Sequence, residues 1–146
     1  MINYDYASRT KRLLNWIIDT LTILILWVAL LFLVVRLIPI LGITDWLETG
    51  KKYDLSLSFF ILFLLYYIIF EGIFKTSIGK IITRTRIIRL NGNRIRFYDA
   101  IIRTLSRLIP FEQFSFLSEN PVGLHDSYSN TRIINQKTRV YVFKQI

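Results

Sequence analysis

The sequence predicts a mainly α-helical membrane protein. We expect a two-span transmembrane hairpin with a small cytoplasmic β-hairpin and an interfacial amphipathic helix. Two long apolar runs, at about 13–35 and 55–74, predict the spans, because about 20 apolar residues cross a hydrocarbon core. The mean hydropathy of +0.42 supports this class, since soluble proteins are usually more polar.

The charge distribution predicts the orientation. Residues 1–12 carry a net charge of +2, the segment 36–54 is neutral, and residues 75–146 carry +9. Basic residues gather at the cytoplasmic ends of spans, so we expect both termini to be cytoplasmic. A basic protein could instead bind nucleic acid. The two spans make an anionic inner leaflet of the lipid bilayer the better partner for this charge, and we expect no nucleic acid.

The first span carries a polar stripe near its cytoplasmic end. Arg12, Asn15, Asp19 and Thr22 are spaced i, i+3, i+7 and i+10 and fall on one face of a helix. A carboxylate in a bilayer is costly, so Asp19 needs a partner or a wet cavity. Its functional interpretation is a ligand, ion or proton site. The structural interpretation is an ion pair that holds the span to a neighbour, and the pattern leaves both open.

The first span is expected to end near Arg36, because Pro39 and Gly42 break a helix. Residues 38–54 then form a short outer loop.

The second span contains a single charge, Glu71, near its inner end. Asp19 also lies near the inner end of its span, so the two carboxylates could face one another. Two carboxylates in one site would favour proton uptake. The plainer alternative places Glu71 at headgroup level, either solvated or paired with Lys75, its i+4 neighbour.

Residues 75–80 resemble the end of a phosphate loop but lack its first glycine and its strand–loop–helix context, so we expect no nucleotide there. Residues 81–97 alternate apolar and polar residues around Asn91-Gly92, the strongest short-range signal for a β-hairpin. Arginines at five positions would make this hairpin a basic ribbon against the inner leaflet: Arg84, Arg86, Arg89, Arg94 and Arg96.

Residues 98–109 predict an amphipathic helix, ended by Pro110. Two arginines, Arg103 and Arg107, make it a poor span and a good interfacial helix. We expect these arginines to be candidates to reach Asp19. Four apolar residues follow as a patch for lipid or the spans: Phe111, Phe114, Phe116 and Leu117. Residues 131–134 and 138–143 look like short strands that close the cytoplasmic unit.

The sequence offers no catalytic or metal centre that we can defend. It has no cysteine, which excludes thiol chemistry. His125 is the only histidine, and with its neighbour Asp126 it falls short of the three or four protein ligands of a typical zinc site. We therefore expect no enzyme activity, no metal and no cofactor.

Taken together, these stretches resemble the RDD family of small bacterial integral membrane proteins, over about residues 7–134. The resemblance is carried by motif residues in a fixed order: Arg12 and Asp19 in the first helix, Thr76, Gly79 and Lys80 after the second span, the turn Asn91-Gly92, Arg103 in the stretch 100–117, and the closing His125, Asp126 and Thr131. The sequence departs from the family pattern in the extra spacing after Thr76 and at three positions: Thr83, Ser127 and Asn130.

The resemblance implies one membrane domain over residues 1–146, in the bacterial cytoplasmic (inner) membrane, with a cytoplasmic-side part from residue 75. Its function is largely unassigned in the family, with transport suggested and sodium/proton exchange proposed for some members. We favour a non-catalytic accessory or scaffold subunit. The alternative is a transport or ion-exchange module. Two spans cannot enclose a pathway, so this module would act as a homo-oligomer or in a larger membrane protein complex.

Overall fold

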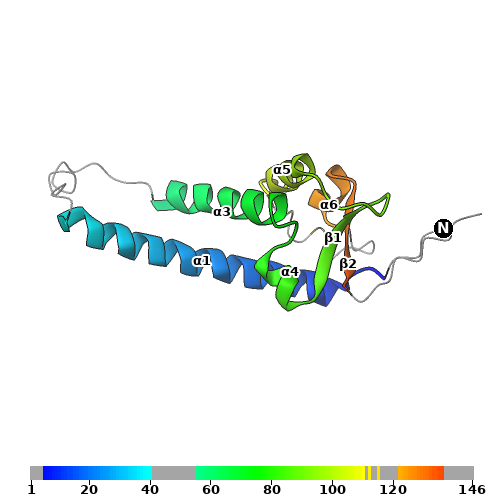
Figure 1. Cartoon of the computed structure of the whole chain (residues 1–146), viewed down its shortest axis with the longest axis horizontal. Coiled ribbons are helices and arrows are strands. Elements are labelled where there is room, and N and C mark those ends of the chain that lie inside the picture. The colour runs from blue at the N-terminus through cyan, green and yellow to red at the C-terminus, as the bar shows by residue number, and fades with distance from the viewer. Residues whose placement is uncertain (1–4, 41–54, 111, 113–114, 116–121, 137–146) are drawn as a thin grey trace, which may run out of the picture.

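The computed structural model describes residues 5–40, 55–110, 112, 115 and 122–136. Two long helices, α1 (Arg9–Ile40) and α3 (Leu55–Gly72), lie side by side and run in opposite directions (Figure 1). At one end of this pair lie five short elements: α4 (Ile78–Ile82), β1 (Thr85–Arg89), α5 (Phe97–Ser106), α6 (Leu124–Tyr128) and β2 (Thr131–Asn135). We call the described residues from 73 to 136 the head.

Both α1 and α3 are long and apolar enough to cross a membrane, as the two apolar runs predict. The apolar side chains of α1 are largely exposed; Ile25 is 67% exposed and Phe32 62%. Such an extended apolar surface is rare on a soluble monomer and fits a helix that is solvated by lipid.

The first helix is longer than predicted. It runs through Pro39 to Ile40 instead of ending near Arg36. The proline is tolerated because it lies in the last turn, where its ring disturbs few hydrogen bonds. Gly42 and most of the predicted outer loop lie outside the described residues.

Aromatic residues hold α1 and α3 together. Ile23 of α1 forms a buried cluster with Tyr66 and Tyr67 of α3, and Trp27 of α1 packs edge-on against Phe59 of α3 with ring centroids 5.7 Å apart. Nearer the far end of the pair, the Trp27 ring nitrogen donates to the hydroxyl of a serine on α3, at 3.0 Å. In lipid, such close packing and interhelical hydrogen bonds take over from the hydrophobic effect as the driving force for helix association.

The predicted β-hairpin around Asn91-Gly92 is wrong in its pairing. The chain does turn there, and the Arg89 amide donates to the Asn93 carbonyl at 2.9 Å. However, β1 pairs antiparallel with β2, from Thr85 opposite Asn135 to Arg89 opposite Thr131. The second strand of the expected hairpin does not form, because the Asp99 carboxylate accepts a 2.8 Å bond from the Arg96 amide and starts α5. The predicted strand at 131–134 is confirmed as β2; the one at 138–143 lies outside the described residues.

The predicted basic ribbon is also dispersed. Arg89 forms an ion pair with Asp99 at 2.9 Å, and two of the five arginines, Arg86 and Arg94, line one groove. The expected hairpin does not form, so the five arginines do not lie along one β-ribbon.

The amphipathic helix predicted at 98–109 forms as α5, and its polar face points inward. Asp99 and Arg103 are 3% and 0% exposed, whereas Tyr98 and Leu105 are 68% and 56% exposed. This is the reverse of a water-soluble helix and turns the apolar face away from the protein. The apolar patch predicted at Phe111, Phe114, Phe116 and Leu117 lies outside the described residues.

Candidate functional site

A network of buried charged side chains lies where the helix pair meets the head. Its centre is Arg103 of α5, which is fully buried. Its Nε donates to Glu71 Oε2 at 2.7 Å, and its Nη1 donates to both Asp126 Oδ1 and Thr131 Oγ1. One guanidinium group therefore connects α3, α5, α6 and β2.

Glu71, at the inner end of α3, is surrounded by cations. Besides Arg103, it accepts bonds from Lys80 Nζ and Arg107 Nη2, each at 2.9 Å. The expectation that Glu71 is solvated or paired with Lys75 is wrong. The helix ends at Gly72, and Lys75 follows in a loop with a left-handed φ of 61°, so the i+4 geometry is lost and Lys75 Nζ donates to the Gly72 carbonyl instead.

Asp126 of α6 ties the start of α1 to the head. Arg12 Nη1 donates to Asp126 Oδ2 at 2.6 Å, and Arg103 binds the other carboxylate oxygen. Burial alone would raise the pKa of Asp126, but the His125 ring and the two guanidinium groups outweigh this and hold it below its usual value. Asp126 is therefore an anion at neutral pH, and it joins two arginines.

Asp19 accepts hydrogen bonds from uncharged groups. Its Oδ1 accepts from the Tyr66 hydroxyl at 2.8 Å and the Gly79 amide at 2.7 Å, and its Oδ2 accepts from the Ser77 hydroxyl at 2.6 Å. The expectation that arginines of the amphipathic helix reach Asp19 is wrong, because α5 packs on α3 and α6 while Asp19 faces α4.

Asp19 and Glu71 do not share one site. They hold separate partners, and the link between them runs through Lys80, whose Nζ donates to the Ser77 hydroxyl at 3.0 Å and to Glu71. The hypothesis of a coupled carboxylate pair therefore fails in its simplest form.

Asn15 fixes α4 and β1 against α1. Its amide is best oriented with the nitrogen toward the Gly79 carbonyl, at 3.0 Å, and the oxygen toward the Thr85 hydroxyl, at 3.1 Å. Gly79 makes this approach possible. A Cβ at that position would lie 2.9 Å from the Asn15 Cα and closer still to the Asn15 carbonyl oxygen.

Gly79→Ala is expected to destabilise the fold by about 1 to 3 kcal/mol, since overpacking against backbone cannot relax by a side-chain rotation. Thermal unfolding of the purified chain in detergent measures this. Gly72→Ala is the matched control, because its added Cβ meets only the side chains of Phe97, a half-exposed ring, and Ala100. Equal losses of stability in the two variants would contradict the close contact between α1 and α4.

His125 lies under the network. Its Nδ1 bonds to Glu112 Oε1, and its Nε2 lies 3.5 Å from Asp126 Oδ1. Burial lowers the pKa of His125, and the nearby arginines add to this effect against the two carboxylates. The ring is therefore neutral at pH 7, with its proton on Nδ1, where it can donate to Glu112. The same bond outweighs burial and keeps the pKa of Glu112 below its usual value.

Acidification below about pH 6.5, the ordinary pKa of histidine, is expected to destabilise the protein by up to about 1.4 kcal/mol per pH unit. The unfolded chain binds a proton on His125 in this range, whereas the folded chain does so only at lower pH. Below about pH 4, protonation of Asp126 adds a further loss, because its folded pKa is depressed. Unfolding temperatures against pH test this. His125→Gln should flatten the curve near pH 6, and an unchanged curve would contradict the assignment.

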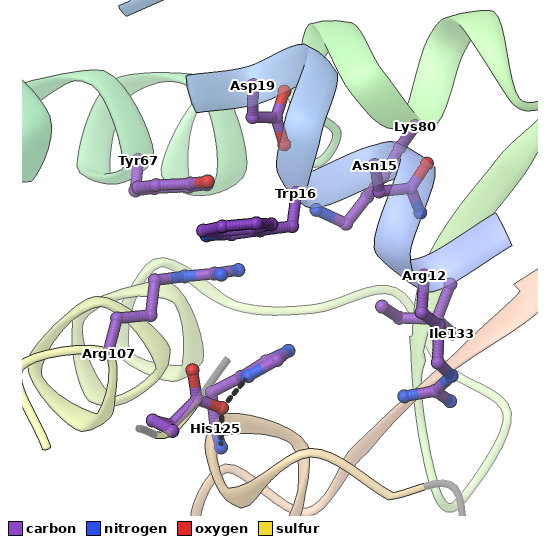
Figure 2. Close-up of a pocket in the computed structure, with 10 residues that line it drawn as sticks. Arg12, Asn15, Trp16, Asp19, Tyr67, Lys80, Arg107, His125 and Ile133 are labelled. Carbon is purple, nitrogen blue, oxygen red and sulfur yellow. Dashed lines mark hydrogen bonds and ion pairs between the residues drawn. The ribbon is translucent and has the colours of Figure 1, made fainter. Parts of the chain in front are cut away.

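A small polar cavity of about 30 Å³ lies inside the network (Figure 2). Tyr67 borders it, and no described residue offers its buried hydroxyl a hydrogen-bond partner. The Arg107 guanidinium lies 4.0 Å above the centre of the Tyr67 ring. The space suffices for about one ordered water and excludes an organic substrate. Among the described residues, no three His, Asp or Glu side chains form a group that could hold a metal ion.

Most of the predicted site residues meet in this network. Those brought together are Arg12, Asn15, Asp19, Glu71, Gly79, Lys80, Arg103, His125, Asp126 and Thr131. Thr76 stays apart, with its hydroxyl 3.4 Å from the Ser77 carbonyl.

Four participants in the network were not predicted from the sequence: Tyr66, Ser77, Thr85 and Glu112. Arg107 was predicted as a candidate partner of Asp19, whereas it binds Glu71. The four unpredicted residues carry no local signal in the sequence.

Comparison with known proteins supports the membrane assignment. The sequence model of the RDD family matches residues 6–134, which is most of the chain and covers the elements described above up to the last residue of β2. Searches of curated proteins and of solved structures found no match. The matched segment contains both candidate spans and the charged network. The chain therefore belongs to the RDD family of membrane proteins.

Proposed function

We propose that this protein is a non-catalytic accessory or scaffold subunit of an assembly in the bacterial cytoplasmic membrane. The observation that carries the proposal is the internal balance of the network. Its four cations and four carboxylates are nine-tenths or more buried: Arg12, Lys80, Arg103 and Arg107 with Asp19, Glu71, Glu112 and Asp126. Because these charged groups balance one another inside the protein, little net charge remains to bind a ligand.

The proposed placement puts α1 and α3 across the membrane as a hairpin, with both termini and the head on the cytoplasmic side. The net charge of +9 on residues 75–146 supports this orientation. The outward apolar face of α5, with Tyr98 and Leu105, supports its position in the plane of the inner leaflet. The buried charges then lie at headgroup depth, shielded from lipid by α5.

In this position the network works as a clamp between the spans and the head. A buried ion pair adds little net stability, but removal of one partner costs about 3 to 5 kcal/mol. Such pairs can fix one geometry, here that of the head on the spans. A fixed head surface at the inner leaflet suits a subunit that presents contacts to other proteins.

The mass of the particle extracted in nanodiscs, with its subunits identified, tests the proposal. We expect a stoichiometric complex that contains other membrane proteins. Arg103→Met should release these partners, because the head loses its position on the spans, whereas Arg36→Gln, at the far end of α1, should leave the complex intact. Recovery of the wild-type chain only as a monomer or homo-oligomer would overturn the accessory role.

One observation favours transport or ion exchange as the second candidate. Asp19 lines the cavity and accepts its hydrogen bonds from uncharged donors, beside the unpartnered hydroxyl of Tyr67. A homo-oligomer would have to supply the rest of a pathway, since this cavity is closed to anything larger than about a water molecule. Flux of sodium or protons in proteoliposomes that contain the chain alone would support this candidate.

A further inference from the structure

A second polar region lies on the head, and none of the residues that line it belongs to the charged network. It is a groove of about 570 Å³ between the segment that leaves α3 and the strand β1 with its following turn. Ile73, Phe74 and Lys75 form one wall, and Arg86 and Arg94 belong to the other. The groove therefore joins the inner end of a candidate span to the basic surface of the head.

The charge of this groove has one sign. Lys75, Arg86 and Arg94 line it, and no acidic side chain does so among the described residues. Arg86 also takes part in a further interaction of its own, whereas among the other arginines of the head Arg89 pairs with Asp99 and Arg103 is fully buried. Arg94 is exposed, and no carboxylate of the described residues pairs with it. A ligand that carries negative charge would be attracted here.

The apolar side of the groove lies next to the cations. Ile73 and Phe74 are 63% and 62% exposed, directly after the last residue of α3. Two exposed apolar side chains beside three cations match a ligand with an anionic head and an apolar tail. A free phosphate would not use the apolar side.

We propose that this groove binds one anionic phospholipid of the inner leaflet. Its phosphate lies between Lys75 and Arg94, with Arg86 at the base, and one acyl chain runs along Ile73 and Phe74 toward α3. The inference rests on the proposed cytoplasmic placement of the head, which brings the groove to headgroup level. It adds to the accessory role a defined lipid contact next to the clamp.

Native mass spectrometry of the full chain in detergent tests the proposal directly. Phosphatidylglycerol and phosphatidylcholine with the same acyl chains are titrated in parallel. We expect one phosphatidylglycerol to be retained per chain at concentrations where phosphatidylcholine is lost. Lys75→Gln with Arg94→Gln should weaken this binding about 30-fold, since each basic residue near an anionic surface contributes roughly a fivefold effect.

Two controls make the outcome decisive. Arg36→Gln removes a cation at the far end of α1 and should leave lipid binding unchanged. An unaltered unfolding temperature of the double variant excludes a folding defect. Equal retention of both lipids, or undiminished binding by the double variant, would overturn the proposal. Competition by inorganic phosphate at the concentration of the lipid would show a free-anion site instead. Because detergent-extracted protein is used, these failures are distinct from the absence of partner proteins.

Discussion

Arg103→Met is expected to lower the free energy of unfolding by about 3 to 5 kcal/mol. The substitution keeps much of the side-chain volume but leaves Glu71 and Asp126 buried with fewer compensating charges. It also deprives Thr131 of a donor. A small domain is stabilised by about 5 to 15 kcal/mol in total, so this loss removes a large part of the free energy that keeps the protein folded. Thermal and chemical unfolding of the full chain in detergent measure the loss.

Arg107→Met is the matched control for Arg103→Met. Arg107 also donates to Glu71, but it makes none of the bonds by which Arg103 reaches Asp126 and Thr131, and its side chain is 9% exposed. We expect a loss less than half as large. Arg103→Lys should lose nearly as much stability as Arg103→Met, because a single ammonium group cannot reproduce the planar guanidinium contacts with α3, α6 and β2. A wild-type unfolding curve for Arg103→Met would refute its central position.

The second large effect is expected for Glu71→Gln. This change leaves Lys80, Arg103 and Arg107 around a neutral amide in a buried site, and of the three only Arg103 keeps a carboxylate partner, Asp126. We expect a loss of about 3 to 5 kcal/mol, comparable to that for Arg103→Met. Because the substitution is nearly isosteric, the loss reports charge and not packing. Equilibrium unfolding in detergent measures it.

A double variant shows whether the stability loss of Glu71→Gln comes from unbalanced charge or from a local change at that residue. Adding Lys80→Met to Glu71→Gln removes one of the three cations that surround this position and should restore roughly 1 to 2 kcal/mol, as expected for side chains that share a network. If the two losses simply add, the lysine and the glutamate act independently and the network is not a unit.

The sequence was sufficient to predict the features of the fold that depend on a single helix. Apolar length identified both spans, and the cost of a carboxylate in lipid showed that Asp19 needs partners. The β pairing was missed because Asn91-Gly92 is a local signal, whereas β1 finds its partner some 40 residues later in the chain. The residues around the turn do not indicate which distant strand pairs with β1.

The site shows the same limit. Arg103 and Asp126 were named from the resemblance, and their direct contact became visible only in three dimensions. The alternation of faces along α5 was correct. However, periodicity alone could not reveal that its polar face turns toward α3, because that depends on which solvent covers the other face. Ser77 and Tyr66 could not be found, since an isolated hydroxyl near an apolar run has no characteristic spacing.

Asp19→Asn tests most directly whether the network clamps a subunit or handles an ion. The unfolding temperature, the co-purifying partners and the sodium-dependent proton flux are measured on one preparation, in nanodiscs and in proteoliposomes. The amide cannot accept all three hydrogen bonds of Asp19, so we expect stability and partner binding to fall together, with a cost of about 1 to 3 kcal/mol. Wild type and variant should show the same flux as protein-free vesicles. A stable, fully assembled Asp19→Asn protein that has lost a flux present in the wild type would contradict the clamp and identify Asp19 as an ion site.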